Sequence, residues 1–510
     1  FGSSVCLSFS VQMASASVTR RVVFRSRLQY ASAKRGLTSV SRFLRGDADF
    51  EEVRTEAFVG DATGVNAAQI VAAACNSPTA ERKAGTDEAL GDALTPFVKS
   101  LSGRDVHEIL GLMLASNFRP KGLLDALARA SQARLRSFSP FHLVNLVSRM
   151  SKLNLASHSF YEQSAEQMVD VVDQLSSFDI SIAAFALSKR GYRDPKLYSA
   201  FAQRLTKTYE DVQIVNVGLI LNAFSTVAHC DPELFHALSR TMLLAPPENC
   251  RPSDIALMLN ACARCNYRKP RLFQVLSTRI IDCVDEFTPS DVTNCVHAFA
   301  KLDTFDHRVL HRLGVRAADL LSDFEGYELI LVLHSFAKLR FGQGPMYECL
   351  FAELEARVLR GDELNSRSLT TALDAIRRKP VGNRLLLVHS LAKRLDEDLA
   401  TCCATAATLG GWSLVELGEI GAVPGLGQRV LEHLRRSENM TQENLFHVRH
   451  FVKSYQIKAE MEYATLPKPL RKWCHGLFDT PTDWNVVKQG KEQGSRRSTR
   501  RSPNSEDEVQ

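Results

Sequence analysis

Three stretches of the sequence, SPFHLVNLVSRMSKL (139–153), TPSDVTNCVHAFAKL (288–302) and EGYELILVLHSFAKL (325–339), share one order of apolar and polar positions. Their apolar residues recur every three or four positions, which indicates helices and not strands. A polar residue near the start of each such helix recurs at steps of 37 or 38 residues, at Asp105, His142, Asp179, Asn216, Asp254, Asp291, Glu328 and Asn365. A register held over eight units is the signature of a repeat protein.

A second series marks the start of the following helix. A proline or histidine recurs at the same step, at Pro120, His158, Pro195, Pro232, Pro270, His307 and Pro345. Proline suits the first helical position, because its missing N–H has no helical partner there. Asp194 and Asp231 are natural N-caps. The equivalent positions Phe224, Cys262, Phe299 and Phe336 are predicted core.

Each unit is thus a pair of antiparallel helices that is too small to bury its own apolar face. Stacking of neighbouring pairs buries it. We therefore predict an all-α fold, an α-solenoid of about eight or more helix-turn-helix repeats of 37 residues.

The predicted organisation has five parts: a transit peptide (1–46), an N-terminal helical cap (47–101), the repeat solenoid (102–379), degenerate repeats with a C-terminal cap (380–470) and an extended charged tail (471–510). Residues 1–46 hold eight basic residues and no acidic one, a composition typical of a mitochondrial transit peptide. A basic arm is the alternative. The glycine-rich segment 409–427 is expected to break the repeat register.

The charge balance limits the classes of function. Without the eight basic residues of 1–46, 55 basic residues face 57 acidic ones, so the body is nearly neutral. Any contact with RNA must then come from locally placed charge. No apolar run reaches the roughly 18 residues that a membrane span needs. Most of the twelve cysteines are predicted to be reduced, and the lone Cys262-x-x-Cys265 pair is weak evidence for zinc.

The common catalytic motifs are absent. The sequence contains no GxxxxGK[ST], no HExxH and no paired CxxC spacing. We expect no catalytic residues, no metal site, no cofactor and no small-molecule substrate, and therefore a binding protein and not an enzyme.

The period and the motif Ala298-Phe299-Ala300-Lys301 resemble the heptatricopeptide repeat family, over roughly residues 102–379. Octotricopeptide and pentatricopeptide repeats are similar organellar families with periods of 38 and 35. The resemblance implies an RNA-binding role in mitochondria, in transcript processing or in ribosomes with fragmented ribosomal RNA. Several members of that family end in a nuclease-like RAP module, and none is evident here after Thr441.

Two columns of residues are candidates for RNA contact. The first varies and is largely polar, and it includes Ser148, Asn222, Asn260, His297 and His334; the second lies four residues further on and holds the cations Lys152, Lys189, Arg264, Lys301 and Lys338. Our hypothesis is that the first column contacts bases and the second contacts phosphates. Two structural alternatives remain. Cations near a helix C-terminus are stabilised by the helix dipole, and polar side chains can hydrogen-bond between repeats.

The function predicted from the sequence is RNA binding in the mitochondrial matrix, as a structural component or assembly factor of the mitochondrial ribosome that contacts ribosomal RNA. Mitochondrial ribosomal or other matrix proteins are the expected protein partners. A protein-binding scaffold of another mitochondrial complex is the first alternative, favoured by the neutral body. A transcript processing or stability factor is the second.

Overall fold

The computed structural model describes residues 40, 42–47, 64–76, 83–155, 157–342, 344–437 and 440–479, and these residues form α-helices and short 3-10 helices with no strand among them. Contacts divide the chain into two compact units. Unit 1 comprises residues 1–229 and 236–241, and unit 2 comprises 230–235 and 242–510. The predicted transit peptide lies almost wholly outside the described residues.

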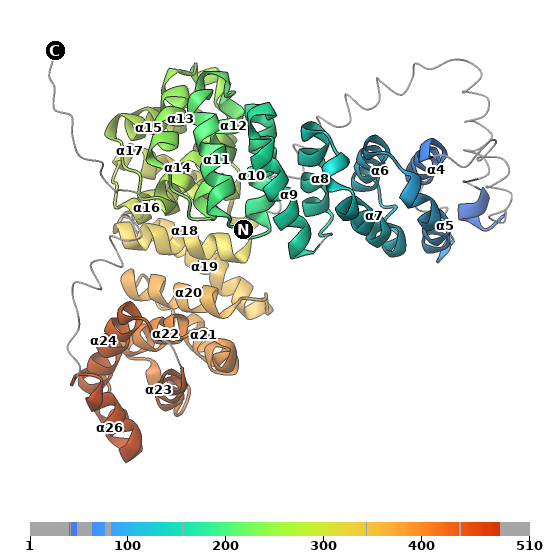
Figure 1. Cartoon of the computed structure of the whole chain (residues 1–510). Coiled ribbons are helices and arrows are strands. Elements are labelled where there is room, and N and C mark those ends of the chain that lie inside the picture. Colours follow the sequence, from blue (N-terminus) through green and yellow to red (C-terminus); the bar gives the residue numbers. More distant parts are fainter. Residues whose placement is uncertain are drawn as a thin grey trace, which may run out of the picture. The chain divides into compact units, whose positions relative to one another are not determined.

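Unit 1 contains four complete helix pairs and part of a fifth. Its helices are α4 (Gly64–Asn76), α5 (Thr86–Leu94), α6 (Gly103–Ala115), α7 (Lys121–Ala133), α8 (Pro140–Lys152), α9 (His158–Asp170), α10 (Ser177–Lys189), α11 (Pro195–Lys207) and α12 (Ile214–Thr226). The first helices α4, α6, α8, α10 and α12 pack on one another in series (Figure 1). Helix α13 (Pro232–Leu244) contributes residues to both units.

Unit 2 continues the same arrangement. Its helices are α14 (Pro252–Arg264), α15 (Pro270–Cys283), α16 (Pro289–Leu302), α17 (His307–Asp319), α18 (Gly326–Leu339), α19 (Gly344–Arg360), α20 (Ser366–Arg378), α21 (Leu385–Glu397), α22 (Ala404–Leu417), α23 (Leu426–Arg436), α24 (Gln442–Lys458), α25 (Glu460–Thr465) and α26 (Lys468–Gly476). First helices α14 to α24 form one layer, and second helices α15, α17, α19 and α21 form another. The prediction of an all-α solenoid is confirmed.

The ends of the helices explain why the repeat is so regular. Capping boxes close the first helices at Ser102 with Asp105, Ser176 with Asp179 and Thr288 with Asp291. After the first helix, one residue adopts a left-handed conformation, and it recurs at Asn154, Gly191, Ala228, Asn266, Asp303 and Arg340. This conformation lets the next N–H reach back to a carbonyl of the last helical turn, as Thr304 N does to Phe299 O at 3.0 Å.

Buried arginines tie the second helices of unit 2 together, a feature that the sequence did not reveal. Arg279 donates to the carbonyls of Met242 and Ala245 at 2.8 and 2.6 Å. The same role falls to Arg316, Arg357 and Arg394, each bonded to carbonyls that end the preceding repeat. These bonds satisfy carbonyl groups that the helix ends leave open. The predicted core residues Phe224, Cys262, Phe299 and Phe336 are buried as expected.

The structure corrects the repeat register in two places. The N-caps of α18 and α20 are Glu325 and Asn365, a step of 40 residues, because α19 is 17 residues long. Asn365 is therefore the N-cap itself and not a position three residues later. The segment 409–427 does not break the register, since α22 is regular. A Cβ at Gly410 or Gly411 would lie under 3.0 Å from Leu395 or Phe451, so the glycines permit close packing.

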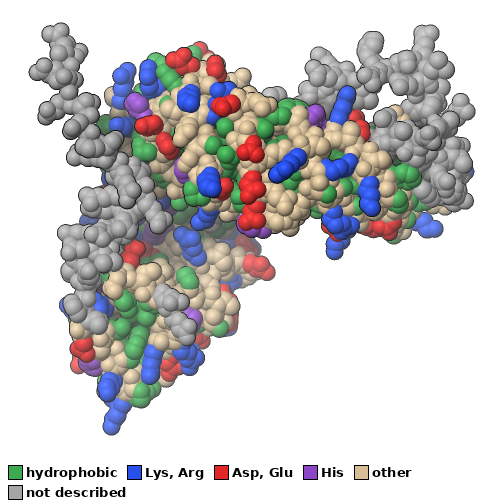
Figure 2. All heavy atoms as spheres, in the orientation of Figure 1, with side chains coloured by type: hydrophobic (Ala, Val, Ile, Leu, Met, Phe, Trp, Pro, Cys, Tyr) green, Lys and Arg blue, Asp and Glu red, His purple; other side chains and the backbone are tan. Residues whose placement is uncertain are grey.

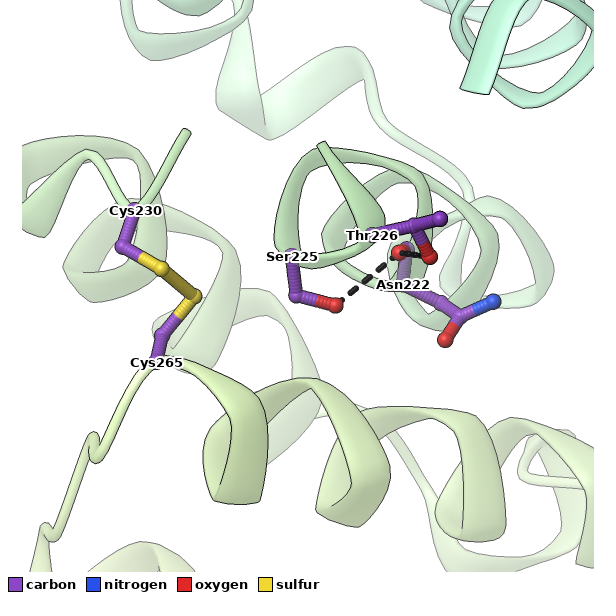
Figure 3. Close-up of a disulfide and its surroundings, with 5 residues drawn as sticks. All are labelled: Asn222, Ser225, Thr226, Cys230 and Cys265. Atoms are coloured by element: carbon purple, nitrogen blue, oxygen red, sulfur yellow. Dashed lines mark hydrogen bonds between the residues drawn. A yellow bond between two sulfur atoms is a disulfide. The ribbon is translucent and has the colours of Figure 1, made fainter. Parts of the chain in front are cut away.

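Two expectations about the cysteines and the tail also change. Cys230 and Cys265 form a disulfide, with Cα atoms 5.5 Å apart (Figure 3). Cys265 is thus not available to pair with the buried, free Cys262 on a metal. The predicted tail begins later than residue 471, because α26 runs from Lys468 to Gly476 and buries Leu470 and Cys474. The tail beyond residue 479 lies outside the described residues.

Candidate nucleic-acid interface

The N-caps give each first helix a common origin, and the cation column lies thirteen residues after it. In unit 1 the column contains Lys152 and Lys189, which are exposed at the ends of α8 and α10. In unit 2 it contains Arg264, Lys301, Lys338 and Arg378. Sequence reasoning missed Arg378, because the register was set three residues too early at Asn365. The cap pattern Asn-x-x-Ser at 365–368 is the signal that would have found it.

The four cations of unit 2 lie on successive helices of one layer, and we call them the basic ladder. Burial lowers the pKa of Lys301, and the neighbouring charges of Arg264 and Lys338 lower it further. Burial and the charge of Arg378 likewise lower the pKa of Lys338, although Asp303 and Asp374 act in the opposite direction. The cations are therefore close enough to repel one another. An anion placed along the ladder would relieve this repulsion.

No carboxylate of a described residue forms an ion pair with Lys301 or Lys338. Both ammonium groups are exposed. The helix dipole explains a preference for cations at these positions, but it does not explain why cations from neighbouring repeats are adjacent. Their arrangement suits a chain of phosphates.

A second row runs beside the ladder, nine residues after each N-cap. In unit 2 it contains Asn260, His297, His334, Asp374, Trp412 and His450. Asn260 is only 8% exposed, whereas His297 and His334 are half-buried. Burial lowers the pKa of His297 to about 4, and the charges of Lys301, His334, Lys338 and Arg264 contribute to that shift. His297 is neutral at pH 7 and can both donate and accept a hydrogen bond.

Asp374 connects the row to the ladder. Its carboxylate is buried and receives hydrogen bonds from Arg377 and Arg378, while His334 Nε2 lies 2.9 Å from Oδ2. Burial alone would raise the pKa of Asp374, but its hydrogen bonds to His334 and Arg378 hold that pKa well below the ordinary value. The guanidinium carbon of Arg377 lies 4.5 Å from the centroid of the Trp412 ring. One buried anion thus fixes three cationic or polar side chains.

Unit 1 offers less of this surface. Ser148 is 8% exposed, so its hydroxyl has little access to a base. The main-chain oxygen of Asn222 accepts hydrogen bonds from Ser225 and Thr226 (Figure 3). Its side-chain Oδ1 is buried and accepts none from a described residue. Of the predicted site residues in unit 1, only Lys152 and Lys189 are exposed. The predicted residues that the structure brings together are those of unit 2.

The wider surface carries no dominant charge. Figure 2 shows acidic and basic side chains interspersed over the visible face. Among the described residues, no group of three or more histidine, cysteine, aspartate or glutamate side chains is placed to hold a metal ion. No helix within the described ranges is long and apolar enough to cross a bilayer. The basic ladder is thus a local feature.

Comparison with solved structures yields only weak likenesses. A homology model of the full-length AP-3 complex in an intermediate open conformation is 10% identical, covers 96% of this chain and 94% of its own, and has a TM-score of 0.26. A circular tandem repeat protein with a novel repeat topology is 11% identical, covers 91% and 99%, and has a TM-score of 0.16. Both scores are too low to support an argument. No curated protein matches the chain.

A family model gives a more informative match. The model described as RNA-editing substrate-binding complex 6 protein matches residues 103–343 and, in a second match, residues 248–374. Together the matches span more than half of the chain. They include α6 to α19 and most of α20, and therefore most of the helices that carry the basic ladder. The chain belongs to the RNA-editing substrate-binding complex 6 protein family.

Proposed function

We propose that this protein is an RNA-binding subunit of a mitochondrial ribonucleoprotein assembly, and that the basic ladder of unit 2 holds single-stranded RNA. The observation that carries the proposal is the adjacency of Arg264, Lys301, Lys338 and Arg378 on four successive helices. The family name, which refers to an RNA-editing substrate, supports the same class of ligand.

The geometry favours a single strand over a duplex. Packed helices lie about 8–10 Å apart, so the ladder offers one cation for each step of that size. Helical-repeat proteins that bind single-stranded RNA read about one base per repeat. The cations of the ladder would contact phosphates, and the neighbouring His297 and His334 would contact bases or sugars.

The identity of the RNA is the finer part of the proposal. The sequence led us to expect ribosomal RNA of the mitochondrial ribosome, and the resemblance to heptatricopeptide repeats carried that expectation. The family name favours an RNA-editing substrate or a similar processed transcript instead. We therefore place the protein in an RNA-processing assembly first and in the ribosome second. The basic composition of residues 1–46 supports the mitochondrial matrix as its location.

A protein-binding scaffold is the second candidate. The near-neutral body and the interspersed charges of Figure 2 favour it. Helical solenoids expose extended surfaces that bind peptides and helices as readily as RNA. No described cluster of side chains suggests a reaction, so both candidates are binding functions without catalysis.

Crosslinking tests the proposal directly. The full-length protein would be irradiated with a single-stranded RNA that contains 4-thiouridine, and the crosslinked peptides would be mapped by mass spectrometry. We expect crosslinks in α16, α18 and α20. Crosslinks confined to other helices would contradict the assignment of the ladder. Sedimentation of a mitochondrial lysate with and without ribonuclease separates the candidates, because a protein scaffold would keep its position after the RNA is digested.

A further inference from the structure

An aromatic cluster lies next to the basic ladder, on the two first helices that follow it. Trp412 comes from α22, and Phe446 and His450 come from α24. The ring centroids of Trp412 and His450 are 6.2 Å apart, with the planes tilted by 33°. His450 lies edge to face against Phe446, with centroids 4.4 Å apart. We call these three residues the aromatic site.

The indole of Trp412 is held from two directions. Arg377 from α20 covers it, and Asp374 holds Arg377 in place. The indole Nε1 donates a hydrogen bond to Glu416 Oε1 at 3.3 Å. Helix α24 packs against α22, and the half-buried indole meets the exposed His450 there. The tryptophan is fixed, whereas the imidazole is free to turn.

The spacing of the two rings suits an inserted base. Stacked bases are about 3.4 Å apart, so two rings with a base between them are separated by about 7 Å. The observed 6.2 Å is too wide for direct stacking and close to that value. The tilt of 33° opens the gap on one side.

From this geometry we propose that the aromatic site stacks a nucleobase of the single-stranded RNA whose phosphates lie on the basic ladder. The inference rests on the proposed function, since the ladder must carry RNA for its neighbour to receive a base. Trp412 and His450 occupy the same repeat position as His297 and His334, which places the aromatic site in line with the row beside the ladder. Stacking on an aromatic ring tolerates any base, so the site would add affinity with little sequence preference.

Tryptophan fluorescence provides the test. The chain has three tryptophans, so the double variant Trp473→Phe, Trp484→Phe leaves Trp412 as the sole emitter. This full-length protein would be titrated with a single-stranded RNA oligomer and with an abasic oligomer of the same length and charge. We expect the RNA to quench the emission of Trp412 and the abasic oligomer to bind without quenching it.

Two further variants measure the contribution to affinity. Trp412→Ala should weaken binding of the RNA oligomer by about 5- to 100-fold, with the salt dependence unchanged because no cation is lost. His450→Ala should weaken it in the same sense and avoids any loss of core packing, since His450 is exposed.

The outcomes separate this inference from the proposed function. Equal binding of RNA and abasic oligomer, with both variants at wild-type affinity and a steep salt dependence, would overturn the aromatic site and leave RNA binding intact. Failure of both oligomers to bind would overturn the proposed function and the aromatic site with it.

Discussion

Asp374 Oδ2 lies 2.9 Å from Nε2 of His334, on the preceding first helix, and the same carboxylate binds Arg377 and Arg378. The side chain of Asp374 is only 2% exposed. A buried anion that balances two guanidinium groups is costly to remove, because its partners keep their charge. This contact links the row beside the ladder, the ladder itself and, through Arg377, the aromatic site.

Replacement of Asp374 by asparagine should therefore destabilise unit 2. The cost is expected to be about 3 kcal/mol, at the low end for a buried pair because Arg378 is partly exposed. Urea denaturation followed by circular dichroism measures it. Asp285→Asn is the matched control, since its pair with Arg312 is exposed and should contribute less than about 1 kcal/mol. Equal effects of the two variants would contradict the role of Asp374.

The same carboxylate predicts a pH dependence of stability. The pKa of Asp374 in the folded protein lies below its ordinary value of 3.8. The unfolded chain therefore takes up the proton first as the pH falls, and the stabilisation is lost below about pH 4. Urea midpoints between pH 2 and pH 6 should fall more steeply for the wild type than for Asp374→Asn. Parallel pH profiles would show that the folded pKa is not lowered.

His297 predicts a pH dependence of RNA binding. Its pKa is lowered from 6.5 to about 4 by burial and by the cations around it. The unfolded chain binds the proton first, so His297 lowers stability as the pH falls from about 6.5 to 4. A phosphate on the ladder would favour the charged imidazole and raise this pKa. RNA affinity at constant ionic strength should therefore increase below pH 6.5.

Fluorescence anisotropy with a labelled RNA measures that effect. His297→Gln should reduce the gain in affinity at low pH, whereas His311→Gln, on the exposed side of α17, should leave it unchanged. Identical pH profiles for the wild type and His297→Gln would place the RNA elsewhere.

The arginines that tie the second helices make a prediction about stability alone. Arg279→Met would leave the carbonyls of Met242 and Ala245 without their donors, at a cost of about 1–3 kcal/mol. Arg271→Met, an exposed change on the same helix, is the control. Thermal melts should separate the two variants while RNA affinity stays constant in both. A lower RNA affinity for Arg279→Met would contradict a purely structural role.

Much of the fold could be predicted from the sequence, because the repeat is written in local signals. Helix periodicity, the capping pair Thr288 and Asp291, and the prolines that open the second helices each depend on residues within one turn. The recurring left-handed residue was missed, because Asn266, Ala228 and Arg340 share a backbone conformation but no side-chain type. The buried arginines were missed because their partners are carbonyls some thirty residues away.

The candidate site was predicted less completely. The cations Lys301 and Lys338 follow directly from the repeat. Asp374, Arg378 and Trp412 did not, because the long helix α19 shifts the register by three residues and no short-range signal marks its length. The burial of Ser148 and Asn260 was not predictable either, since it depends on how closely neighbouring repeats approach.

The salt dependence of RNA binding tests the central claim most directly. Binding of a single-stranded RNA to the full-length protein would be measured between 50 and 300 mM salt, for the wild type and for the variant Arg264→Gln, Lys301→Gln, Lys338→Gln, Arg378→Gln. Each lost phosphate contact lowers the slope of log K against log salt by about 0.7. The control variant Lys269→Gln, Arg271→Gln, Arg308→Gln, Lys393→Gln removes four exposed cations of the second helices and the turn before α15.

The account predicts a slope smaller by about 3 for the ladder variant, with weaker binding throughout, and a wild-type slope for the control. Circular dichroism confirms that both variants are folded. A ladder variant that keeps the wild-type slope, or a control that loses as much, would contradict the claim that RNA binds along the first helices of unit 2.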